Sequence, residues 1–362
     1  MTSVRRESGY SLIELLVSMA IMMVVTGAIF ALVDPSQSTS QTQPEVQDMQ
    51  QRMRVSTDTL YKDLVMAGAG PYQGAVTGSL VNFFAPVLPR RTGLVGAEAA
   101  TVARADAITL VYIPNSYSQT TIRSGMPITS AELKVNDQAN CPGNDQLCGF
   151  SEGDVILIFD EQGHFDTFTI TNVQDDAGHL QHRGQTLSYD YDVGAAVMMA
   201  ETHTYYLNST DHQLRQYDGG NEDVPVADNV VGLEFAYFGE PDTSKLSKPQ
   251  APITTSCLYP DGSTLVSGLA TLSNAGGSLA PMPLSTFTDG PWCGEGTNQF
   301  DADLLRVRKI RVTLRVQAAT AAFRGTDPLL FANPGTAIGG TRFIPDMVTT
   351  FDVTPRNLNL TR

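Results

Sequence analysis

Hydrophobic residues form one long run near the start of the chain. No charged residue occurs between Leu15 and Val33, and the apolar stretch begins at Tyr10, with Glu14 as its one charge. A helix of this length would rise about 35 Å, which is enough to cross the hydrocarbon core of a bilayer. We therefore predict a transmembrane helix over 10–33. Arg5 and Arg6 precede this helix and predict that the N-terminus stays in the cytoplasm.

A second helical pattern follows after a polar gap. Pro35 removes a backbone donor and disfavours helical geometry at Asp34, so we expect the helix to be interrupted there, before the polar run SQSTSQTQ. Helical signals resume at Pro44. Apolar residues then recur at steps of three, four and seven, at Val46, Met49, Met53, Leu60, Leu64 and Ala67. This stripe predicts an amphipathic helix within 34–70 that ends at Gly68 and Gly70. We expect the stripe to pack on the remainder of the chain, with a neighbouring subunit as the alternative.

The pattern changes to β-strands after Gly70. Runs rich in Val, Ile, Phe, Tyr and Thr are separated by Gly, Pro, Asn and Asp clusters and predict strands at 107–113, 154–160, 165–173, 196–207, 230–238, 305–316 and 342–353. Segment 239–300 is rich in Gly, Pro, Ser and Thr, and predicts a long surface insertion. We expect an α+β fold, in which a transmembrane and amphipathic helix is followed by a mostly antiparallel β head at 71–362.

The composition is that of a globular protein with a strong negative charge. The chain has 362 residues, 42% of them hydrophobic and 17% charged, and its net charge is −15. This charge argues against binding of nucleic acid by the bulk of the chain, so we expect no nucleic-acid partner.

Four cysteines, an even number, lie in the part of the chain that is expected to leave the cytoplasm: Cys141, Cys148, Cys257 and Cys293. Disulfides are therefore the natural interpretation, with three possible pairings. We favour pairing of neighbours, which closes two local loops. A zinc site is the alternative, but the spacing contains no CxxC and no nearby His-x-x-x-His.

The residues just before the apolar run carry the strongest functional signal. A secretory signal peptide needs a small-x-small site after its apolar stretch, whereas Val33-Asp34-Pro35 follows here. The processing signal lies before the stretch, at Gly9. Cleavage after Gly9 would create a positive α-amine on Tyr10. Glu14 is a costly carboxylate in a membrane helix, and it could pair with the Tyr10 amine of a neighbouring subunit and thereby set the axial register of a helical assembly.

The N-terminus RRESG/YSLIELLVSMAIMMVV resembles the class III prepilin signal of type IV pilins and type II secretion pseudopilins. The resemblance implies cleavage after Gly9 by prepilin peptidase, N-methylation of Tyr10 and an assembly role for Glu14. Residues 1–9 would then be the leader peptide. The blocks QQRMRVSTDTLYKDLVMAGAG, GDVILIFD, VVGLEFAYFG, KIRVTLRV and PRNLNL resemble, more diffusely, large PilW-like minor pilins and J-type pseudopilins. An ordinary membrane anchor is the alternative, and it leaves Gly9 and Glu14 unexplained.

The resemblance implies partners and a location. The partners would be prepilin peptidase, other major and minor pilins, and the inner-membrane assembly platform; the location would be the inner membrane and then the pilus surface or a periplasmic pseudopilus. A head of about 290 residues would crowd its neighbours along a shaft, so we expect a minor pilin at the tip or in the initiation complex. A type II secretion pseudopilin is the nearest alternative, and a lectin or enzyme head on a pilin anchor is a third.

Other motifs give weaker signals. Residues 149–153 match the GxSxG nucleophile elbow, but a strand follows them where the elbow needs a helix, so we interpret them as a turn. The glycines at 68–74 follow a helix rather than a strand, which argues against a phosphate loop. Metal binding is the alternative to solvated turns at His179 and His182 with Asp175 and Asp176, at Asp190 with Asp192, and at Asp218, Asn221 and Asp223. We expect no cofactor and no enzymatic activity.

A cluster of basic residues lies within one predicted strand of this acidic chain. The residues are Arg306, Arg308, Lys309, Arg311 and Arg315. They include the polar positions that alternate with an apolar face from Ile310 to Val316, so the basic side should face solvent. We interpret the cluster as a solvated edge of the sheet, with docking of an acidic subunit as the alternative and contact with DNA as a third.

Overall fold

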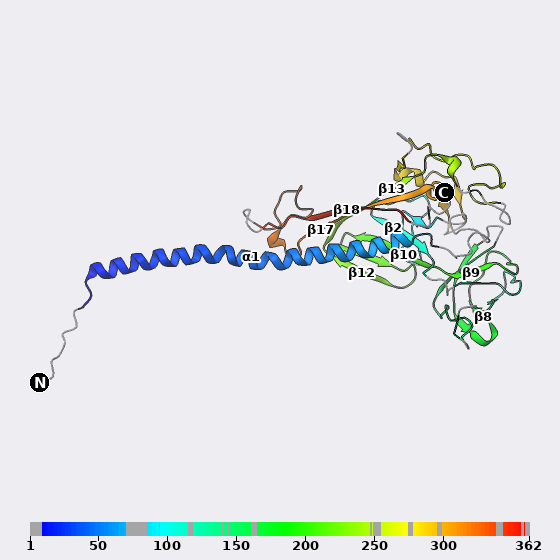
Figure 1. Cartoon of the computed structure of the whole chain (residues 1–362), viewed down its shortest axis with the longest axis horizontal. Helices are drawn as coiled ribbons and strands as arrows, with labels where there is room; N and C mark the ends of the chain where they lie inside the picture. The colour runs from blue at the N-terminus through cyan, green and yellow to red at the C-terminus, as the bar shows by residue number, and fades with distance from the viewer. Residues whose placement is uncertain are drawn as a thin grey trace. The chain divides into compact units, whose positions relative to one another are not determined.

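The computed structural model describes residues 9–69, 85–93, 95–114, 119–138, 141–142, 145–160, 165–246, 248, 255–273, 278–294, 299–337, 343–355 and 358. These residues form one long N-terminal helix followed by antiparallel β-sheets, as the α+β prediction expected (Figure 1). The chain divides into two compact units, Met1–Gln51 with Gln317–Asp346, and Arg52–Val316 with Met347–Arg362. In this division, residues 317–346 belong to the same unit as the N-terminal part of α1.

Helix α1 runs without interruption from Leu12 to Met66. The predicted break at Pro35 is therefore wrong. A proline inside a helix removes one main-chain hydrogen bond, and here the helical bonds on either side carry the backbone through that position.

The apolar stripe of the second helical pattern is buried, as predicted. Met49, Leu60, Leu64 and Ala67 are completely inaccessible to solvent. Two polar residues on the same face of this helix, Ser56 and Asp63, are also buried.

Glycine ends the helix where the sequence predicted. Gly68 has φ of +74°, a left-handed conformation that favours glycine at a helix C-terminus. Its N–H donates to the carbonyl oxygen of Val111 (3.0 Å), and the N–H of Ile113 donates to the carbonyl oxygen of Ala69 (3.0 Å). The end of α1 is thus joined directly to strand β2.

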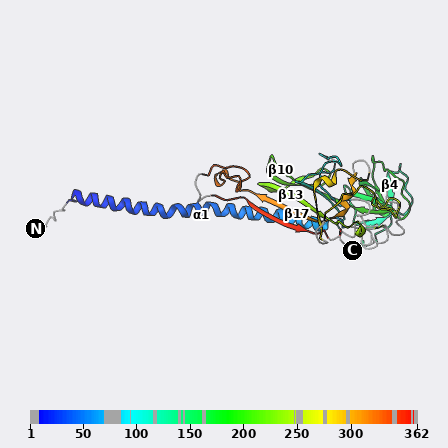
Figure 2. The same ribbon diagram turned by 90° about the horizontal axis from the view of Figure 1, so that it is seen from above.

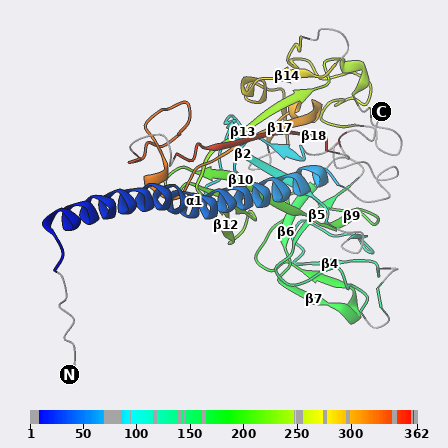
Figure 3. The same ribbon diagram turned by 60° about the vertical axis from the view of Figure 1, so that its left-hand side comes forward.

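A five-stranded sheet in the order β1-β2-β10-β11-β12 lies against the end of α1 (Figure 3). Its strands are β1 Val87–Leu88, β2 Ala107–Tyr112, β10 Glu201–Asn208, β11 Gln213–Tyr217 and β12 Asp223–Asp228. All its pairings are antiparallel. Strands β11 and β12 were not predicted, because Gln213–Tyr217 and Asp223–Asp228 lack a run of β-branched residues.

A second sheet has the order β14-β13-β17-β18. Its strands are β13 Val230–Gly239, β14 Ala280–Met282, β17 Val307–Val316 and β18 Met347–Val353, and every pairing is antiparallel. Strand β18 runs roughly along the C-terminal turns of α1 (Figures 1 and 2), and the ring of Phe351 lies 6.5 Å from that of Tyr61 on the helix.

Two smaller sheets build the other end of the second unit. One has the order β3-β9-β5-β6 and contains β3 Gln119–Thr121, β5 Val155–Phe159, β6 Phe165–Thr169 and β9 Ala196–Met199; the other has the order β4-β8-β7 and contains β4 Glu132–Lys134, β7 Asn172–Gln174 and β8 His179–Gln181. They enclose a core that includes Ile156, Phe168 and Leu180. The predicted strand 165–173 is thus divided between two sheets, as is 196–207, which changes sheets at Ala200.

The 239–300 segment is not merely a surface insertion. Its strand β14 extends the second sheet beside β13, and its residues Leu258, Tyr259 and Phe287 are buried. Two short antiparallel strands, β15 Trp292–Cys293 and β16 Phe300–Asp301, lie at the C-terminal end of this segment.

Candidate functional site

The N-terminal part of α1 exposes an apolar surface. Residues Leu12–Phe30 are the one stretch among the described residues that is long and apolar enough to cross a membrane. None of this stretch is buried inside the chain; the side chains of Leu12 and Met22, for example, are 79% and 71% exposed. A surface of this size and composition requires lipid or neighbouring helices to cover it.

The candidate cleavage site lies just before this helix begins. Gly9 and Tyr10 precede the first helical residue, Leu12, and both are exposed. Apart from its chain neighbours, no atom of the described residues lies within 4 Å of the place that a Cβ on Gly9 would occupy. The backbone at the Gly9–Tyr10 bond is therefore open to an enzyme. The leader residues Arg5 and Arg6 lie outside the described residues.

Glu14 forms a capping box with Ser11 at the start of α1. The N–H of Ser11 donates to Glu14 Oε2 (2.9 Å), and the N–H of Glu14 donates to Ser11 Oγ (3.3 Å). Such a reciprocal pair satisfies two backbone donors that the first turn of a helix leaves without partners. The Ser-x-x-Glu spacing is the sequence signal of this capping box.

The capping box positions the carboxylate for a second interaction. Ser11 engages Oε2, which leaves the Oε1 atom of the described chain available to another donor. Residue 10 immediately precedes the capped turn, so cleavage after Gly9 would create an α-amine beside the helix N-terminus. The carboxylate of Glu14 thus lies at the end of the apolar segment where the new positive charge would appear.

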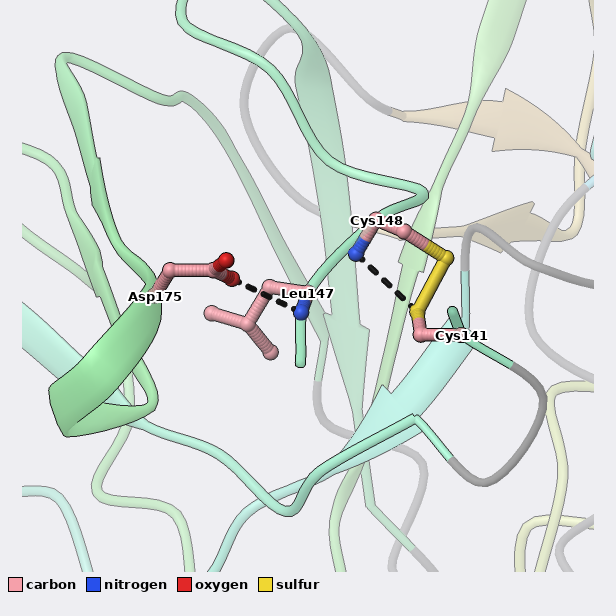
Figure 4. The surroundings of a disulfide bond; sticks show 4 residues. All are labelled: Cys141, Leu147, Cys148 and Asp175. Carbon is pink, nitrogen blue, oxygen red and sulfur yellow. Dashed lines mark hydrogen bonds between the residues drawn. A yellow bond between two sulfur atoms is a disulfide. The ribbon is translucent and has the colours of Figure 1, made fainter. Parts of the chain in front are cut away.

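The four cysteines form two disulfide bonds, in the favoured pairing of neighbours. Cys141 is bonded to Cys148, and Cys257 to Cys293. Figure 4 shows the surroundings of the first bond: the N–H of Cys148 donates to Cys141 Sγ (3.1 Å), and the N–H of Leu147 donates to Asp175 Oδ1 (2.9 Å). Asp175 begins the short helix Asp175–Ala177 between β7 and β8, so this carboxylate holds the small disulfide loop against the neighbouring hairpin.

The GxSxG residues and the candidate metal ligand Asp223 have local structural roles. Gly153 has φ of +96° directly before β5, and the N–H of Ser151 donates to Asp154 Oδ2 (2.7 Å), so the GxSxG letters form a turn that leads into a strand. Asp223 is held by Arg215 (2.9 Å) and Arg91 (3.2 Å). No group of three or more His, Cys, Asp or Glu in the described parts of the chain could hold a metal ion.

The histidine pair also has a local structural explanation. Gly178 turns the chain between β7 and β8 with φ of +63°. His179 lies 3.5 Å from Glu132 Oε2, whereas His182 is buried with its ring 4.8 Å from that of Phe168. Burial lowers the pKa of His182. The two histidines therefore have different neighbours, a carboxylate for His179 and an aromatic ring for His182.

The basic cluster is not a solvated edge. Strand β17 lies between β13 and β18 in the interior of its sheet. Arg306 is buried and pairs with the buried carboxylate of Asp303 (2.8 Å). Arg308 is buried as well, and its guanidinium donates to the carbonyl oxygens of Leu305 and Val307.

The exposed part of the basic cluster is partly neutralised by the adjacent strand. Lys309 and Arg311 both pair with Asp352 of β18, at 3.0 and 2.7 Å. These interactions lower the pKa of Asp352 to about 2, chiefly through the hydrogen bond from Arg311. Sequence periodicity could not reveal these partners, because they come from elsewhere in the chain.

Comparison with known proteins supports the interpretation of the N-terminus. Residues 4–30 match the model of the prokaryotic N-terminal methylation motif. No curated protein matches the chain significantly. The matched residues include Gly9, Tyr10 and Glu14 and the whole of the exposed apolar stretch Leu12–Phe30. The chain thus carries the class III prepilin signal and fits a type IV pilin-like protein.

Proposed function

We propose that this chain is a minor pilin of a type IV pilus, located at the tip or in the initiation complex. Prepilin peptidase cleaves it after Gly9, Tyr10 becomes N-methylated, and the new subunit assembles through its N-terminal helix with other major and minor pilins. Assembly takes place on the inner-membrane platform, where the subunit is held by a single span with its N-terminus in the cytoplasm.

One observation carries this proposal. The methylation motif coincides with an apolar stretch of α1, Leu12–Phe30, none of which is buried inside the chain, while Leu60 and Leu64 near the C-terminal end of α1 are completely buried. The exposed N-terminal part of α1 can therefore move from lipid into contact with the helices of neighbouring subunits, while the head stays folded.

The size of the head supports the tip or initiation position. About 290 residues follow α1, and the sheets and disulfide loops of this region belong to the second compact unit. Subunits of this size would crowd one another if they were repeated at every step of a shaft. The GxSxG residues form a turn that leads into a strand, and this favours a structural and interaction protein over an enzyme.

The processing step can be tested by mass spectrometry of the protein from its native host. We expect assembled material to begin at Tyr10 and to carry a methyl group on its α-amine. Assembled protein that still begins at Met1 would contradict the proposal. Sheared pili should contain the chain in small amounts relative to the major subunit, and its deletion should reduce the number of pili.

A type II secretion pseudopilin is the second candidate, because it would use the same cleavage and the same helix. Loss of secreted enzymes with normal pili in a deletion strain would favour that alternative. Loss of pili with normal secretion would favour the minor pilin.

A further inference from the structure

Strand β6 is an edge strand whose last residue is covered by a side chain. It is the last strand of the sheet β3-β9-β5-β6 (Figure 3). The N–H of Thr169 donates to Gln185 Oε1 (2.8 Å), and Gln185 Nε2 donates to the carbonyl oxygen of Thr169 (2.8 Å). These are the two main-chain groups with which an added strand would pair. The amide of Gln185 therefore covers the edge of β6 at this position.

The covering residue belongs to a tight turn, 182–185, that two hydrogen bonds close. The N–H of Gln185 donates to the carbonyl oxygen of His182 (3.2 Å). In the opposite direction, Nδ1 of His182 lies 3.1 Å from the carbonyl oxygen of Gln185. Gly184 reverses the chain within the turn with φ of +79°, a conformation that favours glycine. The position of Gln185 is thus tied to that of His182.

The ring of His182 attaches the same turn to the neighbouring residue of β6. The side chain is completely inaccessible to solvent, and its ring centroid lies 4.8 Å from that of Phe168. Phe168 itself belongs to the core that the two small sheets enclose. Residues 182 and 185 of the turn therefore contact residues 168 and 169 of β6, so that a displacement of the ring also displaces the covering amide.

Only the neutral ring of His182 fits this position. A carbonyl oxygen can only accept a hydrogen bond, so Nδ1, which faces that of Gln185, carries the proton of the neutral ring. Nε2 is then an acceptor, and it is buried without a hydrogen-bond partner among the described residues. A second proton would lie on Nε2, away from water and without an acceptor there. Protonation therefore favours a conformation in which the ring leaves Phe168 and reaches solvent.

The carboxylate nearest the ring does not reverse this preference. Burial lowers the pKa of His182, and it outweighs the hydrogen bond to Gln185 and the charge of Asp166, which both favour the protonated ring. Asp166 lies on β6, and its Oδ2 atom already accepts hydrogen bonds from the N–H of Ser188 (2.8 Å) and the hydroxyl of Tyr191 (2.8 Å). The carboxylate is thus held in place by groups other than His182.

The other neighbouring elements carry one further charge of each sign. The N–H of His182 donates to the carbonyl oxygen of Ala131 (2.9 Å), just before β4. Glu132 follows on β4, and its Oε2 atom lies 3.5 Å from Nδ1 of His179. Arg183 lies in the turn itself and is exposed. Its positive charge disfavours a second proton on the adjacent His182.

We propose that the turn 182–185 is an acid-released cover of the β6 edge, which protonation of His182 opens. Above the ordinary histidine pKa of about 6.5, the ring is neutral in both the closed and the open turn, and the closed turn is favoured. Below it, the open turn binds more protons than the closed one, so the closed turn loses stability as the pH falls. The main-chain groups of Thr169 are thus covered at neutral pH and accessible in acid. This device does not depend on whether the assembly is a pilus or a pseudopilus.

Hydrogen exchange resolved to single amides tests the proposal on the full-length chain in detergent. The amide of Thr169 reports on the cover. The amide of Phe168 reports on the sheet itself, because alternate residues of an antiparallel strand direct their N–H groups to opposite sides and this one points toward β5. After correction for the intrinsic exchange rate, we expect the protection factor of Thr169 to fall by up to about tenfold per pH unit below about pH 6.5. That of Phe168 should stay unchanged.

Three variants separate the role of His182 from that of the strand around it. His182→Gln should make the protection of Thr169 independent of pH, because a neutral amide replaces the ring. His179→Gln is the matched control: His179 is half-buried on the same strand but lies outside the turn, so the pH dependence should remain. Gln185→Ala should leave Thr169 unprotected at every pH.

The titration of the His182 ring, followed by NMR of the wild-type chain, completes the test. We expect its midpoint below the ordinary value of about 6.5. A Thr169 protection factor that stays constant while the ring titrates would refute the proposal. An equal loss of protection at Phe168 would also refute it, because the sheet would then unfold as a whole. The same holds for a pH dependence that persists in His182→Gln, and for a ring midpoint at or above the ordinary value.

Discussion

The carboxylate of Asp63 on α1 accepts a hydrogen bond from Nδ1 of His203 at 2.5 Å. The hydroxyl of Tyr205 donates to the same oxygen at 2.6 Å, and the hydroxyl oxygen of Tyr112 lies 3.2 Å from the histidine nitrogen. Asp63 is buried, with 7% of its side chain exposed. The helix is thus attached to β10 and β2 by a buried polar cluster as well as by its apolar stripe.

We expect Asp63→Asn to destabilise the head by about 2–3 kcal/mol, because charge-assisted hydrogen bonds to His203 and Tyr205 are lost in a buried position. Tyr205→Phe should cost about 1–2 kcal/mol, because it removes one of those bonds. Chemical denaturation of the full chain in detergent measures both effects. Asp58→Asn is the control on the same helix, because the Asp58 side chain is 72% exposed. An equal effect of Asp58→Asn would contradict the role of the cluster.

The same cluster predicts a dependence of stability on pH. Burial of Asp63 raises its pKa, but the hydrogen bonds from His203 and Tyr205 outweigh burial, so that the pKa lies below its ordinary value. The contribution of these bonds to folding is therefore fully present above the ordinary carboxyl pKa of about 3.9, and it is lost as the pH falls through the folded value. The wild type should lose more stability than Asp63→Asn over this acidic range. If the unfolding free energies of the wild type and Asp63→Asn fall in parallel as the pH is lowered, this prediction is contradicted.

Glu14→Leu should leave insertion and folding intact but impair assembly. Removing a charge from a membrane segment eases insertion by up to about 3 kcal/mol. The neighbouring Tyr10 amine would then lack its partner in a medium of low dielectric. We expect the variant to be cleaved and retained in the inner membrane but poorly recruited into sheared filaments.

Ser11→Ala is the matched control for Glu14. It removes the hydroxyl side of the capping box, at a cost of about 1 kcal/mol to the start of the helix, but it keeps the carboxylate. Recruitment should therefore remain near the wild-type level. If Ser11→Ala and Glu14→Leu reduce recruitment into filaments equally, the role of Glu14 is to cap the helix rather than to pair with a neighbouring subunit.

The two disulfides should differ in their contributions to stability. The chain-entropy relation gives about 4 kcal/mol for the 36-residue separation of Cys257–Cys293 and about 2 kcal/mol for the 7-residue separation of Cys141–Cys148. Paired Cys→Ser variants and denaturant titration compare them. Thiol labelling of the native, unreduced chain should find no reactive cysteine; labelling of two or more would refute the pairing.

Gly68→Ala should destabilise the junction between α1 and β2. The φ of +74° costs a residue with a Cβ about 1 kcal/mol, and the added atom would lie 3.1 Å from Leu358 Cδ2 and 3.2 Å from Pro86 Cγ. Gly184→Ala provides a comparison, because Gly184 has φ of +79° and nothing within 4 Å of the Cβ position. Thermal melts should show the larger loss for Gly68→Ala. Equal losses would mean that backbone conformation alone matters there.

The spacing of apolar residues predicted the buried face of α1 correctly. The predicted helix break at Pro35 was wrong, and the burial of Asp63 was not predicted. Ser56, Leu60 and Asp63 are separated by steps of four and three residues, so helical spacing places Asp63 on the buried face. Its partners lie 140 or more positions away in the sequence, and no local pattern reveals them. For Pro35, local propensity favoured a break, whereas the helical bonds on both sides outweighed the loss of one donor.

The positions of strands could be predicted where their side-chain composition determines them. The order of strands in a sheet could not, because it depends on pairing between distant segments. Strands β2, β5 and β13 are rich in β-branched and aromatic residues, and their predicted limits agree with the structure within two residues. The central position of β17 could not be predicted, since its neighbours β13 and β18 are fixed by long-range pairing. The motif residues Gly9 and Glu14 were found because their signal is local; the capping partner Ser11 was equally local and was missed.

The passage from β9 to β10 has a consequence for how the head responds to stress. The chain leaves one sheet at Met199 and enters the next at Glu201, and the single residue between them, Ala200, is buried and donates its N–H to Val155 (2.9 Å). Because no flexible loop intervenes, a displacement of β9 passes directly into β10, and from β10 through Asp63 into the helix. We therefore expect the small sheet and the five-stranded sheet to unfold together as one cooperative unit.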